Sequence, residues 1–132
     1  MQFTAATFAL LATATSVCAQ TVITPTPGQV LSASEPFNLT FASQRIFKES
    51  SNKIDVVISS LGGGFPGAAP VRDLAPTAFA SDTSAIYSVM VNPIALCCGG
   101  VAGNRTIYVL EDYNAFGGLP GLDEIAVPVT FV

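Results

Sequence analysis

Short apolar segments alternate along the chain with turns rich in Gly, Pro, Ser and Asn. Within most of these segments the apolar residues recur at every second position, the period of a strand with one buried face. In EPFNLTFAS, Phe37, Leu39 and Phe41 fall on one face, and Asn38 and Thr40 fall on the other. No segment carries an apolar repeat of 3.6 residues over three turns, so the pattern predicts an all-β protein.

Six segments are predicted to be strands, each bounded by turn residues. They are residues 21–24, 35–43, 53–60, 84–91, 105–113 and 124–132. In four of the later five, one apolar face is predicted, which holds Phe37, Leu39, Phe41, Ile54, Val56, Ile58, Tyr87, Val89, Val91, Ile125, Val127, Val129 and Phe131. In residues 105–113, Ile107 and Val109 lie opposite Tyr108 and Leu110, which indicates a strand covered on both faces. Pro128 falls on the opposite face of the last segment and indicates an edge or bulge position.

The remaining stretches are predicted to connect these strands. Residues 44–53 (QRIFKESSNK) are the most polar and are predicted to form a helical turn or a disordered loop, and residues 61–70 (LGGGFPGAAP) a long loop at one end. About seven strands in a chain of this length indicate an immunoglobulin-like β-sandwich. The Cys…Trp…Cys pattern of antibody domains is absent, so apolar packing alone must hold the two sheets together.

The first nineteen residues, MQFTAATFALLATATSVCA, predict a cleaved secretory signal peptide. They carry no charged side chain, include an apolar run at residues 8–12, and end in the small-residue pattern of a signal-peptidase site. An N-terminal strand or anchor helix is the alternative. Removing residues 1–19 from the 132-residue chain leaves residues 20–132, 113 in number, which fits one domain.

Charge and hydropathy narrow the range of partners. The chain has five basic and nine acidic residues, a net charge of −4, and no basic cluster, so neither nucleic acid nor an anionic membrane is expected as a partner. After residue 19 no apolar segment is long enough to span a membrane, and the C-terminal stretch lacks the spacer and hydrophobic tail of a GPI signal. A secreted, extracellular protein is therefore expected.

Two N-glycosylation sequons support secretion. They are Asn38-Leu39-Thr40 and Asn104-Arg105-Thr106, whereas Asn92 is followed by proline and is excluded. Glycan attachment requires an accessible side chain, so both asparagines are predicted to lie on the surface.

The residue types needed for most enzymatic chemistry are missing. Without histidine there is no Ser-His-Asp or Cys-His catalysis and no histidine metal site. The pairs Glu111-Asp112 and Asp123-Glu124 are interpreted as solvated loop carboxylates. Two alternatives stay open: Glu111 and Glu124 meeting across a cleft as in a glycoside hydrolase, or a weak calcium site of Asp112, Asp123 and Glu124. We therefore expect that the protein is not an enzyme and binds neither a cofactor nor a metal ion.

Two further features lie in predicted loops or turns. GGGFPG lacks the lysine and Ser/Thr of a phosphate-binding loop, and its Phe65 is interpreted either as a plug at the sandwich end or as a contact for a partner. Cys97 and Cys98 are the only cysteines after residue 19. They admit a vicinal disulfide, intermolecular bonding or two reduced thiols, and we favour a ring-closed or partly buried turn without a catalytic role.

One resemblance covers most of residues 20–132 as a spacing pattern. The chain resembles the fungal necrosis-inducing secreted effector family in three stretches. They are PTPGQ near the start, DVVIS followed by GGGFPG, and IYVLEDYNAFGGLPGLDEIAVPVTFV, which looks like a closing hairpin. The resemblance implies a secreted, non-enzymatic β-sandwich that binds a protein partner, for which receptor-associated kinases of a plant host are the implied class. It carries no catalytic residue over to this chain.

A broader resemblance involves VITPTPGQVLSASEPFNLTF, residues 22–41. This stretch is similar to the opening of the Ig-like N-terminal domain in fungal cell-wall proteins of β-1,6-glucan synthesis and in Ser/Thr-rich GPI-anchored proteins. We therefore expect a small secreted interaction module, effector-like in character, with a structural or glycan-associated cell-wall protein as the alternative.

Overall fold

The computed structural model describes residues 20–44, 48–59, 68–71, 78–81, 84–96 and 102–132. Within these ranges lie nine strands and one helical turn. They are β1 (Thr21–Thr24), β2 (Val30–Leu31), β3 (Phe37–Gln44), β4 (Lys48–Ile58), β5 (Ala68–Val71), β6 (Ala78–Ser81), β7 (Ser84–Val91), α1 (Pro93–Leu96), β8 (Gly103–Ala115) and β9 (Leu119–Phe131).

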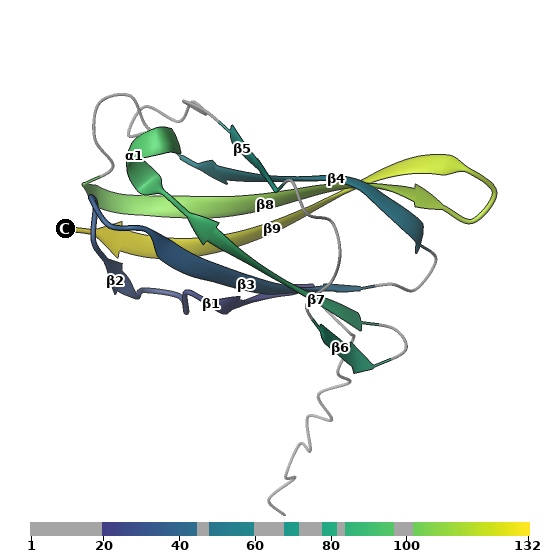
Figure 1. Ribbon diagram of the computed structural model, residues 1–132, viewed down its shortest axis with the longest axis horizontal. Coiled ribbons are helices and arrows are strands. Elements are labelled where there is room, and N and C mark those ends of the chain that lie inside the picture. Colours follow the sequence, from purple (N-terminus) through teal and green to yellow (C-terminus); the bar gives the residue numbers. More distant parts are fainter. Residues whose placement is uncertain (1–19, 45–47, 60–67, 72–77, 82–83, 97–101) are drawn as a thin grey trace, which may run out of the picture.

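The strands form two sheets that face each other as a β-sandwich (Figure 1). One sheet has the order β1-β3-β7-β6 and the other β2-β9-β8-β4-β5. In immunoglobulin letters these orders are A-B-E-D and A′-G-F-C-C′, which is the seven-stranded constant-type set with A′ and C′ added. The predicted immunoglobulin-like β-sandwich is confirmed, with nine strands in the described ranges where about seven were expected.

The first strand changes sheets along its length. β1 pairs antiparallel with β3, whereas β2 pairs parallel with the end of β9 through Val30↔Thr130 and Leu31↔Phe131. The predicted PTPGQ turn, residues 25–29, lies between the two pieces, and the Gln29 N–H donates to the Thr26 carbonyl oxygen at 3.0 Å. Because of this change of sheet, the N-terminal strand closes both layers at one edge.

The core lies between the two sheets. The predicted inward side chains are buried, apart from Val89, which is partly buried and packs against the core. The rings of Phe41 and Tyr87 stack with centroids 5.3 Å apart, and Phe37 packs against Phe131 at 5.9 Å. Phe41 and Tyr87 are cross-strand neighbours in one sheet, whereas the Phe37–Phe131 contact joins β3 to β9 across the two layers. Apolar side chains therefore pack between the sheets, but not alone as the sequence predicts, because the Ser43 hydroxyl on β3 also donates to Glu111 on β8.

Two predictions about connecting segments were wrong in part. Residues 48–53 are the beginning of β4 and not a helical turn or loop, because β4 extends beside β8 as far as Lys48↔Ala115. Residues 68–70 belong to β5, which pairs with β4, and not to a loop. Pro128 is exposed on the outward face, as predicted, and its carbonyl accepts the Gly28 N–H at 2.8 Å.

Candidate functional site

The β8–β9 hairpin projects beyond the opposite sheet and ends the sandwich on one side (Figure 1). Its two strands pair without interruption from Gly103↔Phe131 to Ala115↔Leu119. At the tip the Gly118 N–H donates to the Ala115 carbonyl at 3.0 Å, and Gly117 has φ of +82°. A positive φ at the third residue of a turn is strained for a side-chain-bearing residue, so glycine is required there. The tip is thus a well-defined turn.

Large apolar side chains are exposed around this tip. Phe116, Leu119 and Leu122 keep 66%, 66% and 70% of their surface accessible to solvent. Leu119 shares a strand face with the inward residues of β9, Leu122 lies on the outward face, and Phe116 is in the turn itself. Exposed apolar residues scattered singly are ordinary, but here three lie close to one projecting turn, on both faces of the hairpin. Phe116, Leu119 and Leu122 are called the apolar tip and form a candidate contact surface.

The outer edge of β9 is protected against strand addition. Among the described residues, β9 pairs on that side only with β2, at Thr130 and Phe131. On this side the Thr130 N–H donates to the Gln29 carbonyl oxygen. Along an unbroken strand every second backbone nitrogen points to the same side, so the nitrogens of Pro120 and Pro128 also face the open edge. Proline offers no N–H to an incoming strand, so a partner would be bound by side chains at the tip rather than by an added strand.

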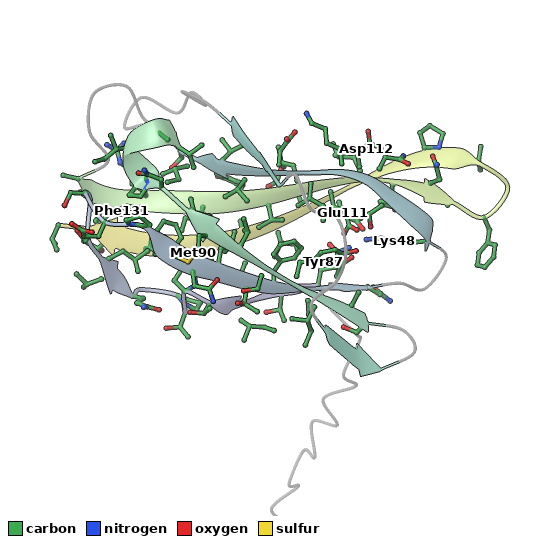
Figure 2. The ribbon with its side chains drawn as sticks, viewed as in Figure 1. Lys48, Tyr87, Met90, Glu111, Asp112 and Phe131 are labelled. Carbon is green, nitrogen blue, oxygen red and sulfur yellow. The ribbon has the colours of Figure 1, made fainter. Side chains whose placement is uncertain are left out.

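A buried ionic cluster lies between the sheets at the base of this hairpin (Figure 2). The Lys48 ammonium is 2.9 Å from Glu111 Oε2 and 2.5 Å from Asp123 Oδ2. The side chains of Lys48, Glu111 and Asp123 are only 5%, 1% and 27% exposed. The side-chain amide of Gln20 also donates to Asp123 Oδ2. One cation thus faces two carboxylates in a largely dry environment.

Hydroxyl groups from both sheets complete the cluster. Ser43 on β3 donates to Glu111 Oε2 at 2.6 Å, and Ser51 on β4 donates to Glu111 Oε1 at 2.5 Å. The Ser51 hydroxyl is in turn 3.4 Å from the Tyr87 hydroxyl on β7. Every buried side-chain nitrogen and oxygen in the described ranges has a hydrogen-bond partner. Glu111 therefore joins the two layers through polar contacts that are fully satisfied.

Tyr113 covers the Lys48 ammonium. Its ring centroid is 4.4 Å from Lys48 Nζ, a distance at which the π face attracts a cation. The same ring lies across the backbone of Gly121, its partner on β9, where a Cβ atom would overlap the ring. Gly121 therefore leaves the space that allows Tyr113 to close over the cluster.

Replacing Gly121 with alanine is expected to displace the Tyr113 ring and to lower the free energy of unfolding by about 1–3 kcal/mol, as overpacking does elsewhere. Urea unfolding of the variant measures the change. In a second variant, Tyr113→Leu with Gly121→Ala, the smaller side chain should recover part of the loss. If the two substitutions simply add, the ring and the glycine are not coupled in this way.

The structure corrects the prediction made for the acidic pairs. All four residues lie on strands rather than in loops, and Glu111 is fully buried instead of solvated. The register pairs Glu111 with Asp123 and Leu110 with Glu124. Glu124 therefore lies on the outward face, and the suggested pairing of Glu111 with Glu124 is wrong.

The calcium alternative fails for the same reason. Asp112 and Glu124 are exposed on the outward face of the sheet, whereas Asp123 points inward to Lys48. In the part of the chain that the structure describes, no group of three or more His, Cys, Asp or Glu side chains is placed to hold a metal ion. The three carboxylates do not converge.

Both predicted glycosylation residues lie at the surface. Asn38 is exposed on β3, and its side-chain oxygen accepts a hydrogen bond from the Ser88 hydroxyl at 2.9 Å. Asn104 is exposed on β8 and accepts one from the Thr130 hydroxyl at 2.9 Å. The predicted exposure of both asparagines is confirmed. Glycan attachment itself stays a prediction.

Asn38→Gln and Asn104→Gln are each expected to remove one N-glycan from the protein expressed in a eukaryotic host. The physical reason is that both side chains are accessible and occur in sequons. The masses of the variants before and after enzymatic deglycosylation measure occupancy. Asn92→Gln is the matched control, because Asn92 is exposed but precedes proline, and its glycan mass should equal that of the wild type.

A shallow open pocket of about 380 Å³ lies at the opposite end of the hairpin, lined in part by Gly28, Asn104, Arg105 and Thr130. The Arg105 guanidinium there donates to the carbonyl oxygens of Ser59 and Ala102, at 3.5 and 3.3 Å. The candidate carboxylates do not line this pocket. Its floor is held by hydrogen bonds within the chain, and a glycan on Asn104 would stand at its rim.

Several predicted features fall outside the described residues. They are the signal peptide (residues 1–19), Phe65, and Cys97 and Cys98. Sequence reasoning in turn missed Lys48 and did not place Glu111 inside. The period of two could have indicated Glu111, since it follows Ile107 and Val109 on the inward face; Lys48 lies in the polar stretch that carried no such signal.

Comparisons with known proteins assign the chain to no family. No protein-family model and no curated protein matches the chain. Among solved structures, the chain is similar to AggA, the major subunit of aggregative adherence fimbriae type I from Escherichia coli. The two share 13% identity with a TM-score of 0.39, over 86% of this chain and 93% of that one. In the described ranges no helix is long and apolar enough to cross a membrane.

Proposed function

We propose that the protein is a secreted, non-enzymatic, effector-like interaction module that binds a host or surface protein through the apolar tip of the β8–β9 hairpin. The observation that carries the proposal is the exposure of Phe116, Leu119 and Leu122 at the end of one projecting hairpin. Apolar side chains held in water on a rigid scaffold are stabilised when a partner covers them, so they favour binding.

The rigidity of the hairpin supports this role. The tip continues an unbroken ladder of the five-stranded sheet, and β4 accompanies β8 as far as Ala115. A contact surface that is already ordered loses little conformational entropy on binding, which favours affinity. The prolines at the open edge of β9 favour docking of side chains into a partner over the addition of a strand.

Acidic residues beside the tip indicate the chemistry of the partner. Asp112 is the cross-strand neighbour of Leu122, and Glu124 lies two residues further along the same outward face. Both are exposed. The surface is therefore apolar with an acidic rim, and it fits a protein that presents an apolar pocket bordered by basic groups.

Capture from a plant extract, the host that the effector resemblance implies, tests the proposal. The immobilised wild-type protein is compared with a tip variant carrying Phe116→Ser and Leu119→Ser. A control variant carries Met90→Ser and Ile94→Ser, which are also exposed apolar residues but lie on β7 and α1. The tip variant should lose the captured protein by about tenfold or more, and the control should retain it.

Two outcomes would contradict the proposal. Equal capture by the wild type and the tip variant would exclude the tip as the contact surface. Absence of a specific protein, together with retention of the wild type on purified fungal wall or β-glucan, would favour the cell-wall alternative that the opening of the chain suggests.

A further inference from the structure

The buried cluster brings together the three groups needed to form an amide bond between side chains. Lys48 offers an amine, and its Nζ is 2.5 Å from Asp123 Oδ2. Glu111 offers a second carboxylate, with Oε2 2.9 Å from the same nitrogen. The residues come from three adjacent strands of one sheet, β4, β8 and β9. A nucleophile, an acyl group and a proton carrier thus share one site.

We propose that Lys48 and Asp123 condense spontaneously in the folded protein to form an intramolecular isopeptide bond, with Glu111 as the catalytic acid and base. The product would join β4 covalently to β9. This inference does not rest on the proposed binding function.

The reaction balances without any further reagent. Glu111 takes a proton from the Lys48 ammonium, and the free amine attacks Cγ of Asp123, forming a C–N bond. After the attack the nitrogen gives a second proton to one Asp123 oxygen and Glu111 returns the first proton to the same oxygen. The C–O bond to that oxygen then breaks, and the oxygen leaves as water. One ammonium and one carboxylate become one amide and one water, nothing is oxidised or reduced, and Glu111 ends as it began.

The surroundings favour this reaction over a simple ion pair. Strands fix Lys48 and Asp123 in contact, which replaces a collision in solution by a reaction within one molecule. The Tyr113 ring and the low exposure of Lys48 keep bulk water from the nitrogen, so water competes little with it for Cγ of Asp123. The Gln20 amide donates to Asp123 Oδ2, where negative charge develops during attack. Asp123 is partly exposed, so the released water has a way out.

The chain contains a built-in comparison. Lys53 Nζ lies 2.6 Å from Asp55 Oδ2, nearly the same separation, but 60% of the Lys53 side chain is exposed. Among the described residues, no second carboxylate lies within salt-bridge distance of Lys53. The Lys53 amine is open to water and has no neighbouring proton carrier, so we expect no amide there. Comparison of the two lysines therefore distinguishes the effect of proximity alone from that of proximity in a dry site with a proton carrier.

Peptide mapping of the purified protein, expressed from the full chain, tests the proposal. Trypsin should not cleave after an acylated Lys48, so the digest should contain residues 46–53 joined to residues 106–132, with a mass about 18 Da below the sum of the two peptides. Cleavage after Lys53 should be normal. An internal succinimide would also remove one water, but it would leave the two peptides separate.

Two variants identify the roles. Lys48→Arg keeps the positive charge but cannot form this amide, and Glu111→Gln keeps the size of the side chain but cannot carry the proton. Both should show no joined peptide, whereas Lys53→Arg should show as much as the wild type. Separate, full-mass peptides 46–48, 49–53 and 106–132 from the wild type would overturn the proposal even if a variant failed to fold. A joined peptide in Glu111→Gln would remove Glu111 from the catalytic role.

Discussion

Lys48→Met is expected to have a free energy of unfolding about 3–5 kcal/mol below that of Lys48→Arg, because it lacks the cation that faces two carboxylates. Glu111 and Asp123 are cross-strand partners, and both reach Lys48 from β8 and β9. Without the ammonium, Glu111 would remain buried as an anion opposite a second anion. A buried charge without its partner is far more destabilising than the intact ion pair is stabilising.

Guanidinium chloride unfolding of the wild type, Lys48→Met, Lys48→Arg and Lys53→Met measures this effect. Lys53 makes an ion pair with Asp55 at the surface, so Lys53→Met should change the unfolding free energy by about 1 kcal/mol or less. Lys48→Arg retains the positive charge but cannot form the amide, so it separates the contribution of the charge to stability from that of a covalent link. Equal losses for Lys48→Met and Lys53→Met would show that burial of the cluster does not determine its contribution.

The apolar half of the architecture could be predicted from the sequence. Phe37, Leu39 and Phe41 recur with a period of two, and a strand with that period can bury only one face. The buried side chains of β3, and those of β9 from Ile125 onward, follow this rule, so the fold class and most of the core could be predicted from the sequence.

The polar half of the interior could not be predicted in the same way. Ser43, Lys48 and Glu111 are buried because they satisfy one another across three strands, and that depends on a register that no single segment encodes. A polar stretch such as residues 48–53 is indistinguishable from a surface loop until its partners on β8 are in place. The change of sheet between β1 and β2 is likewise a property of pairing, not of periodicity.

Phe116 illustrates the same limit at the surface. Its sequence context, NAFGGLPG, indicates a turn, and a hairpin is implied there by the effector resemblance. Whether an aromatic residue in a turn folds back onto the core or stays in water depends on how far the hairpin projects. The register places the turn beyond Ala115↔Leu119, and there the phenyl ring is mostly exposed.

Phe41→Ala is expected to lower the free energy of unfolding by about 3–5 kcal/mol, whereas Phe116→Ala should change it by about 0.5 kcal/mol or less. The two substitutions remove the same atoms from opposite environments. Phe41 is fully buried and its ring stacks on Tyr87, so its removal leaves a cavity between the sheets, whereas Phe116 is mostly in water. Because domains of this size are stable by only about 5–15 kcal/mol, Phe41→Ala should leave a measurable unfolded fraction in mild denaturant.

Urea unfolding followed by tyrosine fluorescence measures both variants, with unchanged slopes confirming that the unfolded states are comparable. The same two proteins then separate stability from binding. Phe116→Ala should keep the stability of the wild type and lose capture of the partner, since its side chain contributes contact area but no core packing. A loss of stability for Phe116→Ala as large as that for Phe41→Ala would mean that Phe116 packs within the protein, and the apolar tip would no longer be available to a partner.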